Sequence, residues 1–238
     1  FNNPLGNREL AADTLGNDEN REIAKKAVRE SLVLLKNERN VLPLKKKAKI
    51  FVSGPAADDV GIQCGGWTKT WQGGQDNSGK WVKGSTILDG FKKIAEENGG
   101  TIYTDPDDIN KADVAVIVIG EKPYAEYEGD EEKLDLYSGK ALEGNKEALE
   151  LAKKARIPVV VILVSGRARI VTEEIDDWNA FVAAWLPGSE GDAVAEVLYG
   201  DYEFKGKLPV TWPSSEDNLK PGDRSCLFPC GFGFTMTE

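Results

Sequence analysis

The chain has 238 residues, of which 40% are hydrophobic and 29% charged, a composition typical of a globular protein with one large domain or two small ones. Its 30 Lys and Arg residues against 40 Asp and Glu give a net charge of −10, which argues against a nucleic-acid backbone or an anionic membrane surface as a partner. Because it contains no histidine, Ser-His-Asp catalysis, Cys-His catalysis and His-ligated metal sites are excluded, and carboxylates become the first candidates for acid–base chemistry.

The N-terminal segment is predicted to be a connection followed by a helix. Residues 1–17 are polar and rich in turn formers, so we expect a linker or the tail of a preceding domain, with the main domain at 18–238. From residue 18 onward apolar side chains recur at the helical period, and Asn17 or Asp18 can cap that helix. The buried face of the helix is expected to consist of Ile23, Ala27, Val28, Ser31, Leu32 and Leu35.

A long loop follows the first predicted strand, Ile50–Val52. Residues 54–84 are rich in Gly, Trp and Gln and show no periodicity. Loops of more than about 12–15 residues are uncommon and are usually functional. Trp67, Trp71 and Trp81 in this loop could stack on the apolar face of a sugar ring, because an indole offers a wide, flat surface. The alternative is that these rings belong to the core beneath the loop.

The next predicted elements are a helix from Ser85, its expected cap, to Asn98, and strands at 101–103 and 114–119. The loop at 121–139 then carries many carboxylates, most of which are expected to be solvated, and their spacing fits no EF-hand calcium loop. Glu126 differs because it lies between Tyr124 and Tyr127. Partial desolvation and neighbouring like charges favour the protonated form of a carboxyl group, as a general acid requires.

The second half of the chain continues the alternation of helices and strands. We expect a helix at 140–155, weakened at its start by Gly144, strands at 159–164 and 180–185, and a helix at 190–199 that ends at Gly200. This pattern predicts an α/β fold, with a mostly parallel five- to six-stranded sheet sandwiched between helices. Ligands of such sheets bind beyond the carboxyl ends of the strands, where both long loops begin.

Other binding chemistries find little support in the sequence. Neither GxxxxGK[ST] nor a GxGxxG after the first strand occurs, so no nucleotide is expected, and no other cofactor or metal is predicted. The three cysteines, Cys64, Cys226 and Cys230, cannot form a disulfide framework. Cys226 and Cys230 could pair with each other or could be small buried hydrophobes.

Several motifs occur in an order that resembles a known family. They are QCGGWTKTWQG (63–73), VIGEKPYAEYEGD (118–130), SGR (165–167), AWLPGSEG (184–191) and GKLPVTW (206–212). Together they resemble the second domain of glycoside hydrolase family 3, in its exo-β-glucanase and β-glucosidase branch, over about residues 18–235. The segment SLVLLKN (31–37) resembles the family's entry into that domain.

This resemblance implies a retaining glycosidase with an N-terminal (β/α)8-like barrel, a C-terminal α/β sandwich and an active site between them. The implied nucleophile is an aspartate on the barrel, which makes the barrel the expected partner and residues 1–17 its end and the linker. Matching the motifs implies that Glu126 is the general acid/base and Trp71 the sugar-clamping ring, which leaves Trp67 as a structural residue. The implied substrate is a β-glucoside or β-glucan oligosaccharide, as in cellulose degradation.

A retaining glycosidase needs two carboxyl groups about 5–5.5 Å apart, so the chain alone is expected to be inactive. Two other functions stay open: a non-catalytic carbohydrate-binding domain that uses the Trp-rich loop, and an interaction domain whose acidic loop binds a cation or a partner. The resemblance also implies a secreted or periplasmic location.

Overall fold

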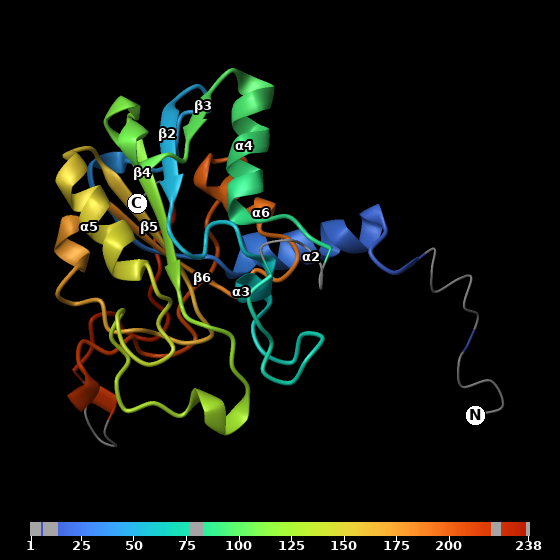
Figure 1. The fold of residues 1–238 in the computed structure, drawn as a ribbon, viewed down its shortest axis with the longest axis vertical. Coiled ribbons are helices and arrows are strands. Elements are labelled where there is room, and N and C mark those ends of the chain that lie inside the picture. Colours follow the sequence, from blue (N-terminus) through green and yellow to red (C-terminus); the bar gives the residue numbers. More distant parts are fainter. Residues whose placement is uncertain (1–5, 7–13, 77–82, 220–224, 237–238) are drawn as a thin grey trace.

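A six-stranded sheet forms the centre of the protein. Figure 1 shows helices on either side of this sheet. The computed structural model describes residue 6 and residues 14–76, 83–219 and 225–236. The strand order is β1-β6-β5-β4-β2-β3, in which β1 pairs antiparallel with β6 and the other neighbours are parallel. The predicted mostly parallel α/β sheet is therefore confirmed. The strands are β1 (Val33–Asn37), β2 (Lys49–Ser53), β3 (Thr101–Tyr103), β4 (Val114–Gly120), β5 (Val159–Val164) and β6 (Ala180–Trp185).

Helices cover both faces of the sheet, because the central strands are apolar on both sides. Helices α2 (Asp18–Ser31), α4 (Ile87–Asn98) and α6 (Asp192–Leu198) pack on one face. Helix α5 (Asn145–Ala155) packs on the other face together with the C-terminal segment, in which Trp212 is fully buried. Helix α3 (Val60–Cys64) lies in the first long loop. Among the described residues, no helix is long and apolar enough to cross a membrane.

Five 3₁₀ turns also occur in the described part of the chain. They are η1 (Glu38–Asn40), η2 (Pro106–Lys111), η3 (Glu126–Gly129), η4 (Ile175–Asp177) and η5 (Glu216–Leu219).

The first helix is shorter than the sequence predicted. Asn17 caps it as expected, because its side chain accepts a hydrogen bond from the Asn20 N–H at 2.9 Å. The helix ends at Ser31, and the predicted helical continuation is wrong: Leu32 takes an extended conformation and Leu35 lies in β1. A short run of consecutive apolar residues is compatible with a buried strand as well as with one face of a helix. In the structure this run pairs with β6. Ile23, Ala27 and Ser31, predicted to face inward, are exposed.

The remaining helix ends follow local backbone chemistry. Thr86, and not Ser85, caps α4, and it forms a reciprocal capping box with Asp89. The Ser85 hydroxyl instead donates to Asp192 at 2.6 Å. Helix α5 begins at residue 145 rather than 140, since Gly144 has a φ of +97° that no helix accommodates. Gly200, with a φ of +80°, follows α6 as the predicted stop.

The topology fixes where the two long loops lie. The chain leaves β2 for α4 on one face of the sheet and leaves β4 for α5 on the other face. The carboxyl ends of these neighbouring parallel strands therefore form a topological switch point, the usual place for a ligand crevice in open α/β sheets. Figure 1 shows both loops beyond this end of the sheet.

Candidate active site

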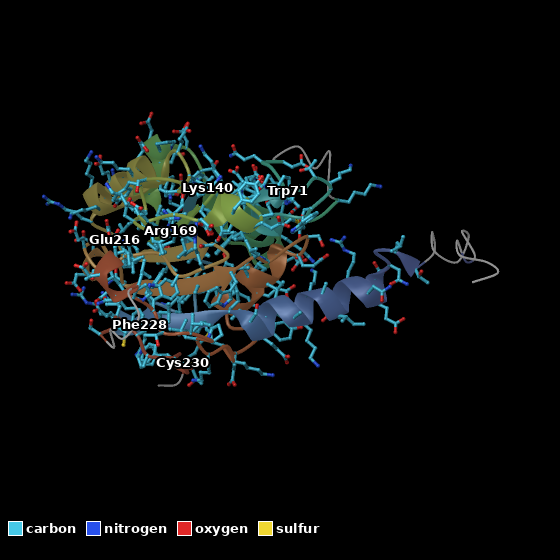
Figure 2. All side chains as sticks on the ribbon, turned by 90° about the horizontal axis from the view of Figure 1, so that it is seen from below. Trp71, Lys140, Arg169, Glu216, Phe228 and Cys230 are labelled. Atoms are coloured by element: carbon cyan, nitrogen blue, oxygen red, sulfur yellow. The ribbon has the colours of Figure 1, made fainter. Side chains whose placement is uncertain are left out.

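The Trp-rich loop and the acidic loop contact each other at the switch point. The ring of Trp71 meets the ring of Tyr127 edge to face, with centroids 5.6 Å apart. Beside it, the Gln72 side-chain oxygen accepts a hydrogen bond from the Ala125 N–H at 2.8 Å, across 53 positions of the chain. The structure therefore places Trp71 next to the segment that carries Glu126. In Figure 2, Trp71 and Lys140 lie on one side of the molecule, and Phe228 and Cys230 on the opposite side.

Two glycines allow this close approach of the loops. A Cβ on Gly66 would lie 2.1 Å from the Tyr124 carbonyl oxygen, which is a backbone atom that cannot rotate away. Gly73 has a φ of +71°, and a Cβ there would lie 2.9 Å from Pro123. The glycine content of the Trp-rich loop thus has a packing reason in addition to the turns it forms.

Glu126 is an exposed carboxylate at the first position of η3. Its φ of +53° lies in the left-handed region, which is unfavourable for a residue with a Cβ. Its side chain makes no hydrogen bond or ion pair with any residue that the structure describes. The aromatic neighbours do not enclose it, since Tyr127 is 61% exposed. The desolvation expected from the Tyr-Ala-Glu-Tyr sequence is therefore not provided by the residues that the structure describes.

Glu121, five residues earlier, has the opposite environment. Its side chain is 2% exposed and pairs with the guanidinium groups of Arg167 at 3.0 Å and Arg169 at 2.9 Å. It also accepts hydrogen bonds from the hydroxyls of Tyr124 at 3.0 Å and Ser165 at 2.7 Å. Both carboxylate oxygens are thus engaged, and Glu121 works as an internal anchor for the loops that follow β4 and β5.

Tyr124 belongs to this anchor and not to a wall around Glu126. Burial, followed by the adjacent Glu121 carboxylate, raises the pKa of its hydroxyl well above the ordinary value, so the phenol stays protonated and donates. The Arg167 guanidinium lies over the Tyr124 ring, 4.5 Å from its centroid. The side chain of Tyr124, two residues before Glu126, is therefore fixed by its contacts with Glu121 and Arg167.

Other carboxylates of the acidic loop also have local partners. Glu131 pairs with Arg167 at 2.8 Å, and Glu128 pairs with Lys140 at 3.1 Å. Asp135 accepts hydrogen bonds from the N–H groups of Tyr137 and Ser138. Most of the run is exposed, as expected from its composition, whereas Glu121 and Glu131 have structural roles.

The other tryptophans of the first loop have different positions. Trp67 is 69% exposed, so the expectation that it is a structural residue is not supported by burial. Its ring centroid is 6.3 Å from that of Trp71, and together they form a continuous aromatic surface. Trp71 is itself 41% exposed, which excludes the alternative that it is a core residue. Trp81 lies outside the described residues.

Sequence reasoning missed the role of the two arginines. Arg169 is 1% exposed, and its guanidinium also donates to the carbonyls of Asp135 and Ser138. The available signal was positional: Glu121 and Arg167 each follow an apolar strand, and β4 and β5 are neighbours. Charged residues at adjacent carboxyl ends of parallel strands are brought together by the topology alone.

The cysteines take no part in this site as described. All three are free, and neither Cys226 nor Cys230 is buried, so both expectations for the pair, a disulfide and small buried hydrophobes, are wrong. Burial, followed by Asp76 and Asp59, raises the pKa of Cys64 to about 11, which keeps its thiol protonated at neutral pH.

The arrangement offers an accessible carboxylate, that of Glu126, beside exposed aromatic rings. Tyr127, whose ring contacts Trp71, is the chain neighbour of Glu126, so a sugar stacked on Trp71 would lie beside the segment that carries Glu126. A single carboxyl group can supply acid–base catalysis but not the nucleophile of a retaining mechanism.

Comparison with known proteins gives a consistent picture. The model of the glycosyl hydrolase family 3 C-terminal domain matches residues 32–236. The lysosomal beta glucosidase of Dictyostelium discoideum is 33% identical over all of this chain and 32% of its own length. The periplasmic beta-glucosidase of Salmonella typhimurium is 30% identical over 82% of this chain and 29% of its own length. The chain thus spans about a third of the length of the curated relatives that it matches.

Solved structures show the same relationship. The exo-1,3/1,4-beta-glucanase of a Pseudoalteromonas species is 39% identical, with a TM-score of 0.83, over 95% of this chain and 30% of that chain. The beta-glucosidase of Listeria innocua in complex with gluconolactone is 25% identical, with a TM-score of 0.78, over 97% of this chain and 35% of that chain.

Proposed function

Because this chain belongs to the C-terminal domain family of glycosyl hydrolase family 3, we propose that it is the acid/base-bearing part of a retaining β-glucosidase or exo-β-glucanase. The observation that carries the proposal is the contact between the Trp-rich loop, which contains Trp71, and the acidic loop, which contains Glu126. This contact lies at the switch point. A sugar platform and an accessible carboxylate lie together where this fold usually binds ligands. The substrate is a terminal β-linked glucose unit of an oligosaccharide or β-glucan.

The proposed mechanism divides the two required carboxyl groups between domains. In the first step an aspartate of the N-terminal barrel attacks the anomeric carbon while Glu126 donates its proton to the departing glycosidic oxygen. In the second step the Glu126 carboxylate takes a proton from water, which attacks the same carbon and releases glucose with retained configuration. The barrel would also cover Glu126, which is exposed here, and so supply its desolvation.

The competing carboxylates of the loop support this choice by their contacts. Glu121 is buried with two arginines, and Glu128 is paired with Lys140. Glu126, in contrast, is exposed and has no hydrogen bond or ion pair from its side chain among the described residues. A general acid must reach the leaving-group oxygen before its pKa matters.

Relatives suggest the sugar and the compartment. The similarity to β-glucosidases and to an exo-glucanase supports glucose as the sugar. Because a β-xylosidase of Formosa agariphila is 31% identical, aryl β-xylosides should be assayed as well. Relatives named lysosomal and periplasmic support a location outside the cytosol, secreted or periplasmic.

The isolated chain is expected to show no turnover of aryl β-glucosides, whereas the full-length protein hydrolyses them. The physical reason is that the nucleophile lies on the barrel, and acid catalysis alone does not form the glycosyl-enzyme. The assay compares both proteins at equal concentration, with mass spectrometry to verify the chain. Enzyme-like turnover by the isolated chain contradicts the proposal, and tight glucoside binding by that chain favours a carbohydrate-binding module instead.

Replacing Trp71 with alanine in the full-length protein is expected to raise KM by about 10-fold, equivalent to about 1.4 kcal/mol of lost binding, with a smaller change in kcat. Stacking holds the substrate and the transition state alike, so its loss acts mainly on binding. Initial-rate kinetics with cellobiose and laminaribiose measure the effect. A kcat loss at constant KM would contradict the role of Trp71 as a sugar platform.

A further inference from the structure

Gln72 is the side chain that joins the two loops directly before Glu126. Its Oε1 accepts the hydrogen bond of the Ala125 N–H at 2.8 Å, and Ala125 itself is buried. Gln72 also follows Trp71 in the chain, so one residue links the proposed sugar platform to the proposed acid. Removing its acceptor would leave a buried N–H without a partner, which is unfavourable.

The position of Glu126 depends on this peptide. Glu126 has a left-handed φ of +53°, and its side chain makes no hydrogen bond or ion pair among the described residues that would fix its direction. The next anchor back along the chain is the Tyr124 hydroxyl on Glu121, which fixes a side chain one residue further away. The Ala125 N–H is therefore the last restrained point before the carboxylate.

We infer that Gln72 is a positioning residue for Glu126: its side-chain oxygen holds the Ala125–Glu126 backbone so that the carboxyl group faces a sugar stacked on Trp71. The inference rests on the proposed role of Glu126. It assigns Gln72 no contact with the reacting atoms. Misplacement of a catalytic group by about 1 Å can lower the rate of a reaction by about 10²-fold.

The chemistry of the amide group allows a sharp test. Since an N–H can only donate, the group that faces Ala125 must be an acceptor, and the other end of the amide, Nε2, is enclosed without a partner among the described residues. Glutamate has the same length and offers an acceptor oxygen in either protonation state. Methionine has similar length and offers no comparable acceptor.

The experiment measures kcat and KM of full-length variants on an alkyl β-glucoside and on an activated aryl β-glucoside. Gln72→Met is expected to lower kcat on the alkyl substrate by about 10- to 100-fold with little change in KM. The value of kcat/KM on the aryl substrate should change much less, because its leaving group needs little protonation. Gln72→Glu should recover most of the lost kcat.

The matched control is Gln75→Met, since Gln75 is an exposed glutamine of the same loop with no hydrogen bond from its side chain in the described structure. It should leave both substrates unaffected. Melting temperatures identify variants whose activity is low because they do not fold. If Gln72→Met is one of them, the kinetics of Gln72→Glu still test the positioning role. Equal losses on both substrates, a pure KM effect, or no recovery by glutamate would overturn the positioning role. If Glu126→Gln itself shows no dependence on the leaving group, the proposed function fails instead.

Discussion

Replacing Glu126 with glutamine in the full-length protein is expected to lower kcat/KM for alkyl β-glucosides and oligosaccharides by about 10²–10⁴-fold. These leaving groups are poor and depend on protonation when the glycosidic bond breaks. Activated aryl β-glucosides should keep most of their kcat/KM, which reports the first step, while their kcat falls because hydrolysis of the glycosyl-enzyme still needs a base. Steady-state kinetics across a series of leaving groups measures this dependence.

The alanine variant adds an independent readout. In Glu126→Ala, azide should raise turnover of the activated substrate, since a small anion can enter the vacated space and attack without base assistance, and β-glucosyl azide should appear as the product. Glu132→Gln serves as a control, because Glu132 is an exposed carboxylate of the same loop. A leaving-group dependence in Glu121→Gln and its absence in Glu126→Gln would show that the assignment is wrong.

Replacing Arg169 with methionine is expected to destabilise the chain by about 3–5 kcal/mol, the usual cost of removing one partner from a buried ion pair. Arg169 is 1% exposed and pairs with Glu121 at 2.9 Å and with Glu131 at 3.2 Å. Methionine retains much of the volume, so the loss measures the uncompensated carboxylates and unpaired carbonyls more than a cavity. Urea unfolding gives the free energy by linear extrapolation.

A double variant separates the ion pair from the rest of the network. Combined with Glu121→Gln, the Arg169→Met change should cost less than the sum of the single changes, because the neutral amide no longer requires a counter-charge. Lys153→Met is the matched control: its partner Asp177 lies 2.7 Å away, but both side chains are exposed, so the urea midpoint should hardly move. Strict additivity of the two buried changes would contradict a coupled network.

The elements that the sequence predicted well are those with a strong local signal. The all-apolar segments β4, β5 and β6 could hardly be anything but buried strands, and Gly200 and Asn17 mark helix ends through their own backbone chemistry. The predictions of secondary structure were wrong where both a helical and a strand pattern fit the same residues. Residues 32–35 are apolar on consecutive positions, so only the free edge of β6 decided in favour of a strand.

For the site, the sequence by itself determined the fold class, the two loops at strand carboxyl ends and, through its motifs, Trp71 and Glu126 as candidates. It could not determine which carboxylate of the acidic loop is buried, because side chains of the same kind differ only in what the fold places beside them. Tertiary structure decided that Glu121 meets Arg167 and Arg169, that Trp67 is exposed, and that Gln72 holds Ala125. These contacts join segments distant in the chain, and desolvation and hydrogen-bond geometry are properties of such contacts rather than of any local sequence.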